Sequence, residues 1–186
     1  MKQGDLGSAL IDPGGSFPVG TTGTWTITHT VGKYGIDDGG SVIITRRAMS
    51  DAIMPQCGDP AAPGYVTAST DGDARLRLWY DNRYFIRPYQ GAIVVKVFDG
   101  SLKEGDTVGI VIGDTSQGSS GWSLQTFPEK RHTFWVRVDA FGPREYYDID
   151  NQPYLTIVPG APASVEAILP TTAKPGGELP VWVRVT

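Results

Sequence analysis

The chain has 186 residues, and its 16 lysines and arginines against 20 aspartates and glutamates give a formal net charge of −4. Charges of both signs are interspersed without a run of like charge, which argues against a phosphate-backbone partner and therefore against nucleic-acid binding. A single cysteine, Cys57, excludes an internal disulfide and any cluster of thiolates for a metal.

Glycine and proline are frequent throughout the sequence. The chain holds 24 glycines and 14 prolines in its 186 residues, whereas the two together make up about 12% of an average protein. This high content of turn-forming residues favours short strands joined by turns over long helices. No stretch approaches the roughly 18 apolar residues of a membrane span, and the N-terminus lacks the apolar core of a signal peptide. The sequence predicts no membrane partner and leaves the compartment open.

Alternating apolar runs are the main structural signal. Residues 24–31 alternate strictly, with Trp25, Ile27, His29 and Val31 on one face. Residues 41–46 contain a continuous apolar run, which predicts a strand buried on both faces. Further strands are expected over residues 65–69, 74–80, 93–98, 107–112, 132–138 and 154–158. The pattern predicts an all-β fold: a mostly antiparallel β-sandwich, immunoglobulin-like or jelly-roll-like, with little helix.

The distribution of turn residues divides the chain into three parts. Residues 1–20, rich in glycine, proline and serine, are expected to lie over the surface as an arm, and residues 21–158 form the sandwich. Residues 159–186 comprise a stiff proline-containing linker and a C-terminal β-hairpin with strands over 164–169 and 179–185. Because two strands do not make a stable domain, the hairpin must pack on its own sandwich, which we favour, or on another chain.

No motif in the sequence carries chemistry. Residues 113–118 have the glycine spacing of a phosphate-binding loop, but Ser119 and Ser120 follow where that loop needs lysine and then serine or threonine. The two histidines, His29 and His132, lie within alternating strands, where a sheet histidine is expected rather than a metal ligand. Turn chemistry explains the paired aspartates better than calcium binding does. These pairs are Asp37 with Asp38, Asp71 with Asp73, and Asp148 with Asp150. The sequence therefore predicts no catalytic residue, no metal site and no cofactor.

One aromatic cluster is a candidate ligand site. Rings interleave with hydrogen-bonding side chains between residues 79 and 89, and such a mixture can form a platform for a sugar or a peptide. Core packing at a strand end would explain most of these rings equally well. Trp122, which its glycine- and serine-rich context predicts to be exposed, is the best single candidate. The predicted ligand-binding residues are Trp122, Trp79, Tyr80, Tyr84, Tyr89 and Arg87.

Several short strings resemble a known family. They are YGIDDGG at residues 34–40, DPAAPGYV at 59–66, RPY at 87–89, GD at 113–114 and QTFPE at 125–129. In this order, over roughly residues 20–160, the chain resembles the N-terminal region of a bacterial family known as domain of unknown function 3604. The resemblance implies an all-β module that precedes a metal-dependent, amidohydrolase-like or PHP-like hydrolase domain in longer proteins.

That resemblance carries over no catalytic residue, because the histidine-rich metal motifs of the hydrolase domain have no counterpart here. The tail from Ala163 also looks like the opening strands of a second immunoglobulin-like module. The preferred interpretation is a non-catalytic module for binding or assembly, with a downstream catalytic domain as its possible partner. The alternatives are a fragment of a metal-dependent hydrolase and a self-assembling structural subunit that exchanges its C-terminal strands.

Overall fold

A computed structural model describes residues 3–185, and strands make up almost all of its regular structure. The elements are η1 (Gln3–Leu6), β1 (Gly7–Asp12), β2 (Gly15–Pro18), β3 (Thr22–Gly23), β4 (Trp25–Val31), β5 (Ser41–Arg47), β6 (Val66–Thr70), β7 (Arg75–Ile86), β8 (Tyr89–Phe98), β9 (Thr107–Ile112), β10 (Trp122–Ser123), β11 (Glu129–Thr133), β12 (Trp135–Asp139), β13 (Tyr147–Asp148), β14 (Tyr154–Val158), β15 (Val165–Ile168) and β16 (Trp182–Val185). Within the described part of the chain, no helix has the length and apolar character needed to cross a bilayer.

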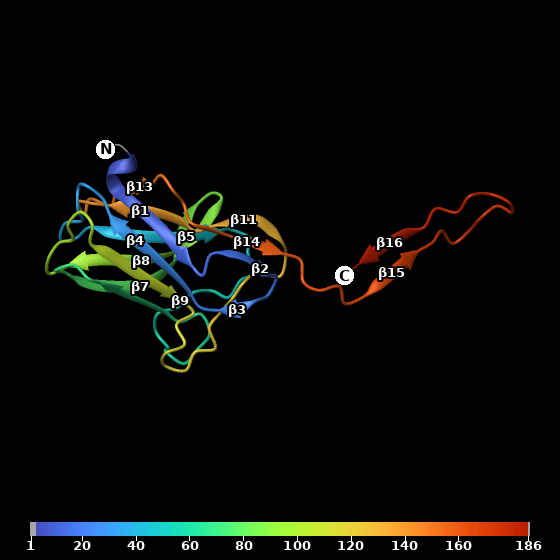
Figure 1. The fold of residues 1–186 in the computed structure, drawn as a ribbon, viewed down its shortest axis with the longest axis horizontal. Helices are drawn as coiled ribbons and strands as arrows, with labels where there is room; N and C mark the ends of the chain where they lie inside the picture. Colours follow the sequence, from blue (N-terminus) through green and yellow to red (C-terminus); the bar gives the residue numbers. More distant parts are fainter. Residues whose placement is uncertain (1–2, 186) are drawn as a thin grey trace.

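Two antiparallel sheets form the sandwich (Figure 1). One sheet has four strands in the order β1-β4-β9-β6, and the other has five in the order β13-β12-β5-β8-β7. Trp25 and Ile27 of β4 and Val42 and Ile44 of β5 belong to one buried cluster between the sheets. The predicted all-β, mostly antiparallel sandwich is confirmed.

The alternation in β4 and the apolar run in β5 have the expected consequences. Every second residue of β4 is buried, including His29, because odd and even side chains of a strand face opposite ways. The first five residues of β5 are all buried. Val42 and Ile44 face the central core, whereas Ile43 joins a small second cluster with Ala92 and Val94 on the outer side of the five-stranded sheet.

The predicted N-terminal arm is wrong for the segment that the structure describes. β1 pairs with β4 from Gly7 to Asp12 and buries Ala9, and β2 pairs in parallel with β14. Both are therefore strands of the fold. The glycine and proline content of residues 1–20 concealed these strands because it signals turns whether or not the intervening residues pair.

The strand expected over residues 132–138 is divided in two. β11 joins a three-stranded sheet with β14 and β2, whereas β12 lies in the five-stranded sheet beside β5. The chain crosses between them at Phe134, which is 2% exposed and donates its backbone N–H to the carbonyl of Pro153. This crossing sets β11 at the edge of the sandwich, where it carries the polar network described below.

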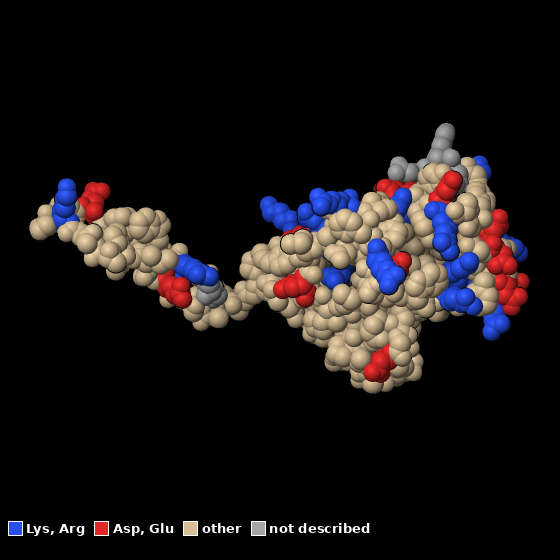
Figure 2. Space-filling view, turned by 180° about the vertical axis from the view of Figure 1, so that it is seen from behind, with Lys and Arg blue, Asp and Glu red and all other residues tan. Residues whose placement is uncertain are grey.

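The C-terminal hairpin extends away from the sandwich (Figure 1). β15 and β16 pair from Val165 with Val185 to Ile168 with Trp182, and every residue of both strands is exposed. The prediction that this hairpin packs back on its own sandwich is therefore wrong. The linker at residues 159–162 is itself exposed, and its prolines favour an extended chain that keeps the hairpin at a distance. Figure 2 shows that the middle of the hairpin surface is uncharged.

Candidate functional site

A cleft of about 580 Å³ opens where three segments meet at the end of the sandwich. We call it the Glu129 cleft. Its walls come from residues 47–50 at the end of β5, residues 85–90 around the β7–β8 turn, and residues 125–129, which lead into β11. Most of the wall is apolar, and charged or amide groups occupy the rest. The apolar side chains are Ala48, Met49, Phe85, Pro88, Phe127 and Pro128, and the polar ones are Arg47, Ser50, Arg87, Gln90, Gln125 and Glu129.

Backbone contacts hold the three walls together. The N–H of Ala48 donates to the carbonyl of Pro88 at 2.7 Å, which ties the first segment to the β7–β8 turn. The carboxylate of Asp51 accepts hydrogen bonds from the backbone N–H of Thr126, at 2.9 Å, and from its hydroxyl. These bonds from Thr126 hold the pKa of Asp51 below its usual value. The cleft is therefore shaped by contacts between segments far apart in the sequence.

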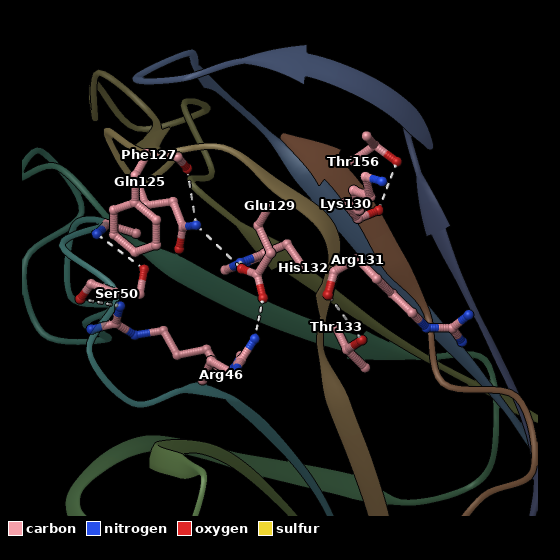
Figure 3. A network of polar contacts seen from close by, with 12 residues as sticks. Arg46, Ser50, Gln125, Phe127, Glu129, Lys130, Arg131, His132, Thr133 and Thr156 are labelled. Atoms are coloured by element: carbon pink, nitrogen blue, oxygen red, sulfur yellow. Dashed lines mark hydrogen bonds and ion pairs between the residues drawn. The ribbon is translucent and has the colours of Figure 1, made fainter. Parts of the chain in front are cut away.

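Glu129 is the centre of the polar network at this cleft (Figure 3). Its Oε1 accepts from Nη1 of Arg47 at 2.9 Å, and its Oε2 accepts from Nε2 of Gln125 at 3.2 Å. Oε2 also lies 2.9 Å from Nδ1 of His132. Burial raises the pKa of Glu129, but the hydrogen bonds from His132 and Arg47 outweigh it and hold the pKa below its usual value. Glu129 is therefore an anion at neutral pH.

His132 is the buried partner of this carboxylate. Its side chain has no exposed area, and its ring packs edge-on against Phe134 with centroids 5.3 Å apart. Burial lowers the pKa of His132, although Glu129 opposes that shift. The imidazole is therefore neutral at neutral pH, with the Nδ1 proton directed to Glu129 and a lone pair on Nε2.

Three buried polar atoms around the network have no hydrogen-bond partner. They are Nε of Arg46, Oε1 of Gln125 and Nε2 of His132. Leaving a buried donor or acceptor unpaired costs roughly 1–3 kcal/mol. Of these three residues, only Gln125 lines the cleft.

The structure separates the predicted ligand-binding residues. Arg87 lines the Glu129 cleft. Trp79 and Tyr84 line a different cavity, on the outer face of the five-stranded sheet. Tyr89 stacks on Trp135 with ring centroids 4.3 Å apart. Tyr80 packs against the central core, over Gly91, where an added Cβ would come within 2.0 Å of the Tyr80 hydroxyl.

The expectation that Trp122 is exposed is wrong. Its side chain is 1% exposed, packs edge-on against Trp25 with centroids 5.6 Å apart, and donates its indole N–H to the carbonyl of Ile53. The glycine- and serine-rich neighbours of Trp122 indicate a loop, but they do not indicate whether the tryptophan side chain packs into the core beneath that loop. A ring buried in this way has no free face for a surface ligand.

No sequence pattern singles out Glu129, Gln125 or Arg47 as site residues, and the alternating pattern predicts an ordinary strand position for His132. In a regular strand, residues three apart point to opposite faces. The pairing of β11 with β14 shifts register between Glu129 and His132, and this irregularity brings the two side chains together. The only local signal was the spacing of a glutamate and a histidine around a strand start.

The side chains described in the structure include no group of three or more histidine, cysteine, aspartate or glutamate residues placed to hold a metal ion. Asp71 instead accepts from the backbone N–H and the hydroxyl of Thr107, and Asp148 pairs with Arg137 at 3.0 Å. The bonds from Thr107 hold the pKa of Asp71 below its usual value. The carboxylates of these two aspartates are thus engaged by neighbouring protein groups.

No protein-family model matches the chain, and no curated protein matches it. Among solved structures, the chain is similar to AvmM, which is described as catalysing macrocyclization in alchivemycin A biosynthesis. The two chains are 13% identical with a TM-score of 0.41, and the alignment covers 86% of this chain and 92% of that one. A likeness of this size carries no argument about function.

Proposed function

We propose that this chain is a non-catalytic β-sandwich module for binding, and that the Glu129 cleft is its ligand site. The resemblance to the N-terminal region of domain of unknown function 3604 supports the non-catalytic part of this proposal, with a downstream catalytic domain as the proposed partner. The observation that supports the proposal is the cleft itself, in which apolar walls lie beside a polar network held by Glu129.

The charges at the cleft favour an anionic ligand. Its charged lining residues are Arg47, Arg87 and Glu129, and Arg47 already pairs with Glu129. Within the described residues Arg87 forms no ion pair, and its guanidinium lies 6.0 Å from the ring centroid of Phe85. An uncompensated guanidinium beside apolar walls fits an organic anion with an apolar body.

The fluorescent anion 8-anilinonaphthalene-1-sulfonate is a suitable probe, because its neutral analogue N-phenyl-1-naphthylamine lacks only the sulfonate. We expect the protein to bind the anion, and Arg87→Gln to weaken that binding by about two- to fivefold, the range for an exposed charge pair. Binding of the neutral analogue should be unchanged by Arg87→Gln. Phe127→Ala should weaken the binding of both probes, because it removes a wall of the cleft. Fluorescence titration measures all six affinities, those of the wild type and the two variants for each probe.

Arg75→Gln is the matched control, since Arg75 is an exposed arginine at the opposite end of β7 and pairs there with Asp99. This variant should bind both probes as the wild type does. An anion site at Arg87 would be contradicted if Arg87→Gln lost the same affinity for both probes. It would also be contradicted if Arg75→Gln lost as much affinity for the anion as Arg87→Gln does.

A second candidate function, self-association through the C-terminal hairpin, is favoured by the exposed apolar side chains of β15 and β16. These side chains are Val165 at 69%, Ile168 at 52%, Trp182 at 57%, Val183 at 64% and Val185 at 56% exposed. An exposed apolar two-stranded ribbon with free edges is a site for pairing with another chain, and a second copy of this hairpin offers the same edges and faces.

Sedimentation velocity tests this candidate. We expect the wild type to sediment as a dimer or larger species, and deletion of residues 160–186 or the Val183→Lys substitution to leave a monomer. Arg184→Lys, which keeps the charge at the next position of β16, should sediment as the wild type does. A wild-type protein that stays monomeric at every concentration would reject self-association.

A further inference from the structure

A second cavity, of about 380 Å³, lies on the outer face of the five-stranded sheet and shares no lining residue with the Glu129 cleft. We call it the sheet-face cavity. Ile43 and Val94 lie at its base, and rings from Trp79, Tyr84 and Tyr146 line it. We propose that the sheet-face cavity binds a neutral saccharide. This site is independent of the function proposed for the Glu129 cleft.

Hydrogen bonds hold two of the rings in place before any ligand arrives. Nη1 of Arg137 donates to the hydroxyl of Tyr84 at 2.9 Å, and Nη2 of the same guanidinium donates to the backbone carbonyl of Tyr146. The hydroxyls of Tyr146 and Ser41 lie 3.1 Å apart. Nε of Arg137 is in turn fixed by Asp148 at 3.0 Å. A site whose side chains are already ordered loses less conformational entropy on binding.

Trp79 supplies the surface on which a sugar ring can stack. Its side chain is 38% exposed, although it sits opposite the buried Val94 in the β7–β8 ladder. Within the described residues its indole forms no stacked or edge-on contact with another aromatic ring, and its N–H donates no hydrogen bond to a protein acceptor. The apolar C–H face of a pyranose complements an aromatic ring of this kind, while its hydroxyls need polar neighbours.

Those polar neighbours lie on both sides of Trp79. Asp81 is two residues further along β7, on the same face, and Lys96 is two residues beyond Val94 on β8. Each is therefore displaced by about 7 Å along the strands, in opposite directions. Asp81 uses one oxygen to accept from the backbone N–H of Arg83 at 2.9 Å, which leaves its other oxygen for a ligand hydroxyl. In the described structure Lys96 takes part in no ion pair.

The charges around the sheet-face cavity favour a neutral ligand over an anionic one. Its lining contains two cations, Lys96 and Arg144, and two carboxylates, Asp81 and Asp139. Asp139 accepts from the backbone N–H groups of Phe141, Gly142 and Arg144, at 3.3, 2.9 and 2.8 Å, so it fixes the loop at the rim. Balanced charge and paired donors and acceptors suit hydroxyl groups, which both donate and accept.

Affinity electrophoresis in native gels tests the proposal with hydroxyethyl cellulose, galactomannan and pullulan as neutral polymers and polygalacturonate as the anionic one. We expect at least one neutral polymer to retard the wild-type protein. Trp79→Ala should weaken that retardation by about tenfold or more in apparent affinity, because it removes both the buried area and the ring contact. Lys96→Met and Asp81→Ala should each weaken it by about fivefold, since each removes one polar contact.

Tyr154→Ala is the control, because it removes another exposed aromatic ring, on β14, outside both the sheet-face cavity and the hairpin. Its mobility should equal that of the wild type in every gel. Trp79→Phe should retain most of the binding, which separates loss of the ring from loss of the fold. Three results would each overturn the proposal: no retardation of the wild type by any neutral polymer, retardation by polygalacturonate alone, or equal retardation of Trp79→Ala and the wild type.

Discussion

Replacing Trp122 by alanine should lower the free energy of unfolding by about 3–5 kcal/mol, the usual cost of removing a buried aromatic side chain. The indole is 1% exposed, and its ring lies within 6 Å of the rings of both Trp25 and Phe134. Its N–H donor also satisfies the carbonyl of Ile53, which the variant would leave unpaired. Urea unfolding followed by circular dichroism measures the change.

Trp182→Ala is the control for this prediction, because its indole is 57% exposed on the projecting hairpin. Its effect should stay within about 0.5 kcal/mol, the usual range for surface positions. If Trp122→Ala cost no more than Trp182→Ala, Trp122 would be a surface residue, and the core described around it would be incorrect.

Acidification should destabilise the protein, and His29 should account for a large part of the loss. Burial lowers the pKa of His29 from 6.5 to about 4, opposed by a weaker contact with the backbone of Ser8. In the unfolded chain the imidazole binds a proton below about pH 6.5, whereas in the folded protein it stays neutral until about pH 4. The contribution of neutral His29 to the free energy of unfolding is therefore fully present above pH 6.5, and it declines as the pH falls from 6.5 to about 4.

The expected slope is about 1.4 kcal/mol per pH unit between these two pKa values, and the total loss is roughly 3 kcal/mol. The measurement is the free energy of unfolding in urea at several pH values between about 7 and 4.5. His29→Gln removes this titration, so its profile should be flatter than that of the wild type by the same slope. Destabilisation by the substitution itself shifts the whole profile without changing the slope. Parallel profiles for the two proteins would show that His29 is accessible to protons in the folded state.

The strands of the sandwich could be predicted because the hydrophobic pattern within each short segment is enough to identify it as a strand. Alternation in residues 24–31 and the apolar run in residues 41–46 each identify which side chains face the core, and β4 and β5 bury those side chains. The N-terminal strands could not be predicted in the same way. β2 is defined by pairing with β14, more than a hundred residues later in the chain, and its own composition indicates turns.

The candidate sites depend on contacts that no local pattern contains. Trp122 is buried against Trp25, and its indole N–H donates to the carbonyl of Ile53, 69 residues earlier. The pair formed by Glu129 and His132 depends on an irregularity in the β11–β14 ladder. The aromatic cluster around Trp79 and Tyr84 was visible in the sequence, but the fold adds Tyr146 from a distant loop. Composition therefore identified the kinds of side chain in one cavity, while the fold determined which of them meet.

The most direct test of the central proposal is a titration of the isotope-labelled protein with 8-anilinonaphthalene-1-sulfonate, followed by its backbone amide resonances. Binding in the Glu129 cleft predicts chemical-shift changes concentrated in residues 47–50, 85–90 and 125–129, the three segments that form its walls. The same titration of Arg87→Gln should need more ligand to reach the same shifts. Shift changes confined to the hairpin at residues 165–185, or no shift changes in the three wall segments, would contradict a ligand site at the Glu129 cleft.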